Sequence, residues 1–188
     1  MSSPIWCAPT AYCVEQMRGQ VQRFSGIWPR SFVYMQRSMA EGEPAFQQII
    51  PYVLLRRKGL IWCYRRCGGD ARLLDRRSCG VGGHVEFEDE RKDPLRTARA
   101  GALRELREEL ALAFDEPQLE PKSWIHERES EVGRVHLGLV MEVECPEEQE
   151  PQIAEPDKLQ ALGWLSPEAI AGDLRFELWS RLALQTPT

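Results

Sequence analysis

The sequence predicts a single α+β domain with a mixed β-sheet. Runs rich in β-branched and aromatic residues alternate with amphipathic helical segments. The chain has no internal repeat and no linker long enough to divide it, and its 188 residues suffice for one hydrophobic core. We therefore expect one domain over residues 45–185, with residues 1–44 as an N-terminal extension packed on it.

The composition excludes several protein classes. With 43% hydrophobic and 28% charged residues, the chain is neither disordered nor collagen-like. Its 24 basic and 29 acidic residues give a net charge of −5. A protein that holds a nucleic-acid backbone usually carries a basic stripe, so we expect no nucleic-acid polymer as a partner.

The cysteines and the apolar runs indicate the cellular location of the protein. Six cysteines are scattered too irregularly for a small disulfide framework, so reduced thiols are expected. The N-terminus lacks a basic stretch followed by an apolar one, and no run approaches the roughly 18 apolar residues of a membrane span. We expect a cytoplasmic protein with no membrane partner.

The first part of the chain predicts mainly strands. A weak pattern favours a helix over Val14–Phe24, and Ser31–Arg37 is typical of a strand. Ile49–Arg56 and Leu60–Arg65 are β-branched and aromatic runs separated by residues 57–59, which predicts a hairpin.

The middle of the chain predicts a glycine loop followed by a long helix. Gly80, Gly82 and Gly83 favour an irregular backbone that can approach a ligand closely. Asp93 is a good N-cap, and the proline after it suits the first helical position. We expect this helix to run to about Leu112.

The last third predicts a return to strands and a final helix. Residues 122–128 and 134–145 are expected to pair as a hairpin, and Leu159–Leu165 is the expected last strand. The pair Ser166–Pro167 again indicates a helix start, and Asp173–Leu184 is typical of a terminal amphipathic helix.

The long helix carries three carboxylates on one side. Glu105, Glu108 and Glu109 stand at positions i, i+3 and i+4, so they project together and repel one another. A hard divalent cation such as Mg²⁺ or Mn²⁺ relieves that repulsion. Arg104, four residues before Glu108, can pair with it and fix its side chain.

A purely structural interpretation of this helix is also open. Glutamate is a strong helix former, and arginine and glutamate around buried leucines are typical of solvated helices. On the helix alone, this interpretation is favoured. The balance shifts with the joint pattern: a glycine pair, a short strand-like segment at 84–86, a helix start, and then Arg-Glu-Leu-x-Glu-Glu.

That joint pattern resembles the Nudix box of the Nudix hydrolase family. Residues 104–112, Arg-Glu-Leu-Arg-Glu-Glu-Leu-Ala-Leu, match the C-terminal half of the box, Arg-Glu-hydrophobic-x-Glu-Glu-x-Gly-hydrophobic. The hairpin before it, the long strand after it and the segment Trp164–Glu168 extend the similarity over about residues 45–185. The strings QIIPYVLL, RRSCGVGGHVEFE and GRVHLGLV look like a bacterial subgroup of predicted phosphoesterases.

The match departs from the family pattern at two places. Ala111 stands where the box has its last glycine, which affects how the helix ends. Gly83 lies 21 residues before Arg104, and the seven residues beyond the family spacing are 87–93. Three nearby glutamates could replace the first glutamate of the box, which has no counterpart in register: Glu86, Glu88 and Glu90.

The resemblance implies an α/β/α sandwich that hydrolyses the pyrophosphate linkage of a nucleoside diphosphate derivative. Glu105, Glu108 and Glu109, with the Gly83 carbonyl, would bind Mg²⁺ or Mn²⁺, which lowers the pKa of an attacking water. The proton would go to Glu109 or to a glutamate of a later loop, for which Glu155 is the first choice. The candidate catalytic residues are Glu108, Glu109, Arg104 and Glu155.

Candidate substrate contacts lie in the glycine loop and among the arginines. Gly82, Gly83 and His84 could touch a phosphate, although a histidine that only closes the loop is an equally good interpretation. Four arginines could clamp phosphates: Arg65, Arg66, Arg76 and Arg77. Of these, we take Arg65 and Arg77 as candidate substrate contacts.

Two other functions stay open. A non-catalytic Nudix-like module could bind a nucleotide or regulate, although it needs no three crowded carboxylates. An isoprenoid diphosphate isomerase would need a catalytic cysteine, for which Cys79 beside Gly80 is a weak candidate. The extension at 1–44 could serve a homodimer as easily as a monomer.

Overall fold

A computed structural model describes residues 3–17 and 19–185 of the chain. Within these residues, ten strands form one mixed sheet. The strands are β1 (Ile5–Pro9), β2 (Val21–Arg23), β3 (Val33–Met35), β4 (Phe46–Arg57), β5 (Leu60–Arg66), β6 (Arg77–Ser78), β7 (Val81–Gly82), β8 (Glu120–Ile125), β9 (His136–Glu144) and β10 (Leu159–Leu165). The helices are α1 (Thr10–Gln16), α2 (Arg37–Ala40), α3 (Pro94–Leu110), α4 (Pro167–Ala171) and α5 (Leu178–Ala183), and 3₁₀ turns lie at Ala71–Leu73, Phe87–Asp89 and Glu116–Gln118.

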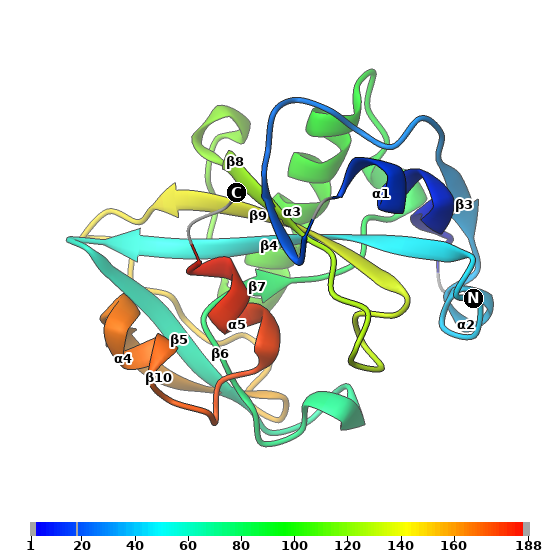
Figure 1. Cartoon of the computed structure of the whole chain (residues 1–188). Helices are drawn as coiled ribbons and strands as arrows, with labels where there is room; N and C mark the ends of the chain where they lie inside the picture. The colour runs from blue at the N-terminus through cyan, green and yellow to red at the C-terminus, as the bar shows by residue number, and fades with distance from the viewer. Residues whose placement is uncertain (1–2, 18, 186–188) are drawn as a thin grey trace.

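The long strand β4 is the centre of the sheet (Figure 1). The main strand order is β10-β5-β4-β9-β8-β2. Strands β4 and β9 pair in parallel from Gln48↔His136 to Arg56↔Glu144, whereas β4 and β5 form the expected antiparallel hairpin. Its turn places Lys58 and Gly59 at φ 50° and 80°, the left-handed values that a two-residue hairpin turn needs.

The expected hairpin after α3 is also confirmed. Strand β8 pairs antiparallel with β9, with Trp124 opposite Leu139. The predicted last strand, Leu159–Leu165, is β10, which pairs with β5.

The N-terminal segment contributes strands to the sheet. Strand β1 pairs with β4 through Cys7↔Gln48 and with β3 through Trp6↔Tyr34. The expected helix over Val14–Phe24 is wrong, because α1 ends at residue 16 and β2 pairs with β8 as the strand at that end of the main order. Pairing with a distant strand overrides the weak local pattern there.

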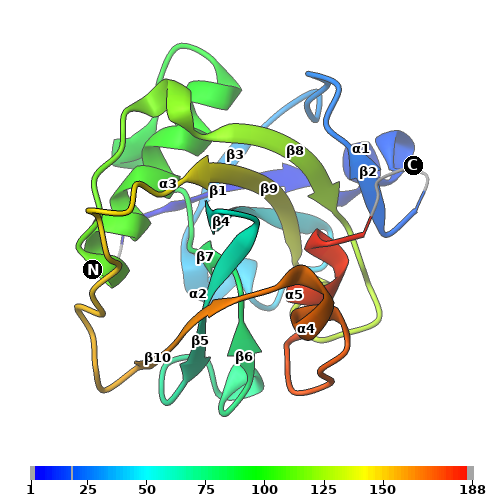
Figure 2. The same cartoon turned by 90° about the vertical axis from the view of Figure 1, so that its left-hand side faces the viewer.

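Helices cover both faces of the sheet and give the expected α/β/α layering (Figure 2). Side chains at alternate positions of β4 point to opposite faces. One set, Ile49, Val53 and Leu55, packs in the core that contains Leu106 and Leu110 of α3. The other set, Ile50, Tyr52 and Leu54, packs with Trp179 and Leu182 of α5.

The local helix signals operate as expected at α3 and α4. The Asp93 carboxylate accepts a hydrogen bond from the Arg96 N–H at 3.0 Å. Helix α3 ends at Leu110, followed by Ala111 at φ 53°. The Ser166 hydroxyl accepts from the Ala169 N–H at 3.2 Å and caps α4.

The terminal helix is shorter than predicted, because α5 begins at Leu178 rather than at Asp173. Backbone bonds hold the preceding residues against β6: the Arg77 N–H donates to the Arg175 carbonyl at 3.0 Å, and the Glu177 N–H donates to the Arg77 carbonyl at 2.9 Å. Among the described residues, no helix is long and apolar enough to cross a membrane.

Candidate active site

A cavity of about 930 Å³ lies where α3, the glycine loop and the start of α5 meet. Its volume is within the range of small-molecule sites. Seven predicted site residues line this cavity: Gly82, Gly83, His84, Glu105, Glu108, Glu109 and Glu155. The fold therefore brings together the glycine loop, the carboxylates of α3 and the later acidic loop.

Gly83 is in close contact with the first carboxylate of α3. A Cβ atom at position 83 would overlap the carboxyl group of Glu105. A larger residue at this position would displace the Glu105 carboxylate.

Arg104 positions the neighbouring carboxylates. Its Nη1 lies 2.8 Å from Glu105 Oε1 and 3.2 Å from Glu108 Oε2, which confirms the expected contact with Glu108 and adds one with Glu105. Its Nη2 donates to the carbonyl of His84 at 2.6 Å. Arg104 does not itself line the cavity, so it acts through the residues that do.

Arg104 also pairs with Asp89, which the sequence did not predict as a site residue. Asp89 is buried, and its Oδ2 lies 3.0 Å from Arg104 Nη2. It belongs to the seven extra residues at 87–93, so this segment supplies the aspartate that pairs with Arg104.

Burial strongly affects the pKa of Glu109, the last of the three carboxylates on α3. Burial raises its pKa to about 7, the Arg66 guanidinium opposes this rise, and Glu105 and Glu155 add to it. Its Oε2 is buried without a hydrogen-bond partner among the described residues. Burial also raises the pKa of Glu105, against the effect of Arg104.

Glu155 reaches the site because its loop packs on the end of α3. The Ala154 N–H donates to the carbonyl of Glu109 at 2.9 Å, and the Gln152 N–H donates to the carbonyl of Leu110 at 3.1 Å. Glu155 in turn holds Lys158 at 2.6 Å. An acidic and a basic side chain of this loop therefore both face the cavity.

Basic side chains line the rest of the cavity. They come from α2, the end of β5, the segment between β5 and β6, the loop before β10, and α5. These residues are Arg37, Arg66, Arg72, Arg76, Lys158 and Arg181. In sequence these residues are too far apart to form a recognisable motif.

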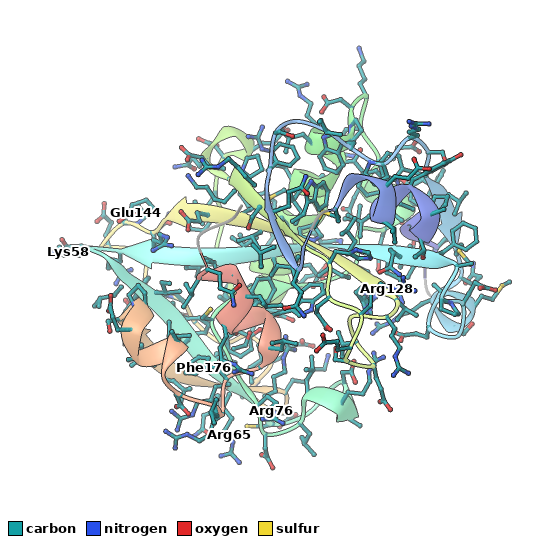
Figure 3. All side chains as sticks on the ribbon, viewed as in Figure 1. Lys58, Arg65, Arg76, Arg128, Glu144 and Phe176 are labelled. Atoms are coloured by element: carbon teal, nitrogen blue, oxygen red, sulfur yellow. The ribbon has the colours of Figure 1, made fainter. Side chains whose placement is uncertain are left out.

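Arg65 and Arg77 lie outside this cavity, which corrects their assignment as substrate contacts. Arg65 pairs with Asp75 at 2.6 Å, and Arg77 pairs with Asp173 at 2.9 Å. Adjacent strand residues point to opposite faces, so the residue after Arg65 and the residue before Arg77 face the cavity instead. Figure 3 shows Arg65 and Arg76 near each other, remote from Lys58 at the hairpin tip.

Arg66 is held in place by buried neighbours. Its guanidinium lies 5.4 Å from the centre of the Tyr64 ring, and its Nη2 donates to the Tyr64 hydroxyl at 3.1 Å. Its Nε lies 3.9 Å from Glu177, which accepts a hydrogen bond from Tyr52 at 2.8 Å. A fixed guanidinium in a cavity is suited to binding a phosphate group.

Known structures share this architecture. The crystal structure of Tm1382, described as a candidate Nudix hydrolase, matches with a TM-score of 0.78 and 22% identity over 96% of each chain. The MutT Nudix hydrolase from Burkholderia pseudomallei matches with a TM-score of 0.57 and 22% identity, over 76% of this chain and 98% of that one. DR0079 from Deinococcus radiodurans matches with a TM-score of 0.54 and 19% identity, over 82% and 91%. The chain has the Nudix fold.

A curated relative is also similar in sequence. Protein YmaB from Bacillus subtilis (strain 168) is 29% identical over 156 residues, which is 80% of this chain and 75% of YmaB. No family model matches the chain. The structural matches confirm, at the level of the fold, the Nudix resemblance that the motif at 104–112 predicts.

The carboxylates of the Nudix motif suit a divalent cation by their chemistry, although their oxygens do not all lie within 4.8 Å of one another. Glu105, Glu108 and Glu109 offer hard carboxylate oxygens along one side of α3. The Oε2 atom of Glu109 is buried and has no hydrogen-bond partner among the described residues, so it is available to bind a cation. The tight approach of Gly83 to Glu105 is consistent with a backbone contribution to the same site.

Cys79 does not support an isomerase on this Nudix scaffold. Its thiol is buried, donates to the carbonyl of Ser180, and does not line the cavity. Burial raises the pKa of this thiol to about 12, which disfavours the reactive thiolate.

Proposed function

We propose that this chain is a metal-dependent Nudix hydrolase that cleaves the pyrophosphate linkage of a nucleoside diphosphate derivative by water attack at phosphorus. The observation that carries the proposal is the charge pattern of the cavity, which is lined by an acidic wall, the three carboxylates of α3, and by a basic wall of six arginine and lysine side chains. A diphosphate fits the basic wall directly, and it fits the acidic wall when cations lie between them.

The acidic wall would hold the metal. Glu105, Glu108 and Glu109, with the Gly83 carbonyl as a further candidate, would bind Mg²⁺ or Mn²⁺. Such an ion neutralises the diphosphate and lowers the pKa of a bound water. Arg104 would keep Glu105 and Glu108 oriented, since its guanidinium contacts both carboxylates.

Proton transfer would fall to a carboxylate beside the bound metal. Glu109 is the first candidate, because its Oε2 is buried and has no hydrogen-bond partner among the described residues. Glu155, beside it in the cavity, is the second candidate. Arg66 and Lys158 would bind phosphate oxygens and stabilise the charge that develops on the leaving group.

The test is Mg²⁺-dependent formation of nucleoside monophosphate from dinucleotides, nucleotide sugars and deoxynucleotides. We expect Glu108→Gln to abolish this product while the fold stays intact. The matched control is Glu144→Gln, because Glu144 is exposed on β9, does not line the cavity, and lies near the hairpin tip with Lys58 (Figure 3). Equal activity of the two variants would overturn the assignment of the α3 site.

A nucleotide-binding module is the other outcome of this assay. Tight nucleotide binding by a wild-type protein that turns over no substrate would establish it in place of the hydrolase. A cytoplasmic location and a homodimer stay predictions, which cell fractionation and light scattering test.

A further inference from the structure

A second group of metal-binding side chains lies in the same cavity, outside the carboxylate wall. The carboxylate of Glu41, at the end of α2, and the imidazoles of His84 and His136 offer ligand atoms that all lie within 4.8 Å of one another. All three residues line the cavity. They come from segments far apart in sequence, and the fold brings them together.

Both imidazoles are oriented by hydrogen bonds to residues outside this group. His136 Nδ1 donates to the carbonyl of Val132 at 2.6 Å, because a carbonyl oxygen can only accept. His84 Nε2 lies 2.8 Å from Oε1 of Gln48, a buried residue of β4. In neutral imidazoles these bonds leave the lone pairs on His136 Nε2 and His84 Nδ1.

This arrangement is the usual one for a metal-binding histidine, whose second ring nitrogen donates to a carbonyl or another acceptor. Neither lone-pair nitrogen has a hydrogen-bond partner among the described residues. Ligand atoms about 2.1 Å from a tetrahedral ion are about 3.4 Å apart, which lies within the 4.8 Å limit on the separations of these three atoms.

The charges around the group select the kind of ion. Arg72 Nη2 lies 3.1 Å from Glu41 Oε2, and Arg37 Nε lies 3.8 Å from Oε1. These two guanidinium groups orient the carboxylate but repel a cation that is held by charge alone. An ion that bonds strongly to imidazole is therefore favoured over Mg²⁺.

We propose that Glu41, His84 and His136 form a second metal site, which binds a divalent transition ion of the Zn²⁺ or Co²⁺ class. Three protein ligands leave at least one position of a tetrahedral ion open to the cavity. With Arg37 and Arg72 beside it, the ion forms a second anion-binding subsite. The proposal does not depend on hydrolysis at the α3 carboxylates.

The test is titration of the metal-free protein with Co²⁺ alone, followed by its visible absorption and by calorimetry, with Zn²⁺ as competitor. In excess Mg²⁺, which occupies the α3 carboxylates in place of Co²⁺, we expect one Co²⁺ ion to stay bound and Zn²⁺ to displace it. Glu41→Gln and His136→Gln should each weaken Co²⁺ binding at least 10-fold, and Gln48→Ala should weaken it by about 10- to 100-fold.

Two controls make the result specific. His126→Gln removes the third histidine of the chain, which does not line the cavity, and should leave Co²⁺ binding unchanged. Glu108→Gln, which tests the proposed hydrolase, should also leave it unchanged. Since His136 is buried, Glu41→Gln is the variant that keeps the test valid if His136→Gln fails to fold. Equal Co²⁺ affinity of wild type and Glu41→Gln, or loss of binding in Glu108→Gln, would overturn the proposal.

Discussion

Ionisation of Glu109 should destabilise the metal-free fold, and Glu109→Gln should remove this effect. Burial raises the pKa of Glu109 from an ordinary 4.5 to about 7. Between these values the folded chain keeps a proton that the unfolded chain has released. The stabilising contribution is therefore fully present below pH 4.5 and is lost as the pH rises through about 7.

The size of the effect follows from the two pKa values. The difference between 4.5 and about 7 corresponds to about 3 kcal/mol of unfolding free energy. His84 acts in the opposite direction, because burial lowers its pKa to about 3 and its neutral form is favoured in the fold. The informative quantity is therefore the difference between variant and wild type, from which the His84 contribution cancels.

The assay is urea unfolding, with a chelator present, of wild type and Glu109→Gln from about pH 5 to about pH 8. Relative to wild type, the variant should gain about 3 kcal/mol of unfolding free energy over this range. A pH-independent difference for Glu109→Gln would show that the fold does not penalise its charge.

Three further substitutions test other contacts, each by urea or thermal unfolding. Ala111→Gly should stabilise the chain by about 1 kcal/mol, because position 111 has the left-handed φ of 53° that disfavours a Cβ atom; an unchanged midpoint would contradict this. Asp89→Asn should cost about 2 kcal/mol, since it removes the charge that pairs with Arg104 in a largely buried site; a neutral effect would show that Arg104 needs no anchor. Gly138→Ala should cost about 1–3 kcal/mol, because the new Cβ atom would lie 2.6 Å from the Trp179 ring; wild-type stability would mean that α5 moves freely away from β9.

Local chemistry explains which parts of the fold could be predicted from the sequence. An N-cap acceptor followed by proline marks the starts of α3 and α4, and a lysine-glycine turn marks the β4–β5 hairpin. These signals act between residues only a few positions apart, so tertiary contacts do not alter them. The three carboxylates of α3 share a face for the same reason.

The basic wall of the cavity could not be predicted in this way. Arg66 and Arg65 are adjacent and chemically identical, and only the phase of β5 decides which one faces the cavity. Glu41 and His136 come together through the parallel pairing of β4 and β9 and through the place of α2 beside β4. Such long-range contacts leave no periodic trace in the sequence.

Two features that the family pattern leaves unexplained, the N-terminal residues and the extra segment 87–93, pack against each other. The Phe87 N–H donates to the carbonyl of Pro4 at 3.0 Å, and the Trp6 N–H donates to the carbonyl of Val85 at 2.8 Å. The Ser3 hydroxyl donates to the carboxylate of Glu88. The N-terminal segment therefore fixes the outer side of the longer loop.

The inner side of the same loop supports the carboxylate wall. Once its first residues are held, the 3₁₀ turn at Phe87–Asp89 directs the Asp89 carboxylate inward to Arg104, which contacts both Glu105 and Glu108. A longer loop without such an anchor would lose conformational entropy on ordering and would orient Arg104 poorly. The extra residues are thus compatible with an intact site because a distant segment, which enters the sheet as β1, holds them in one conformation.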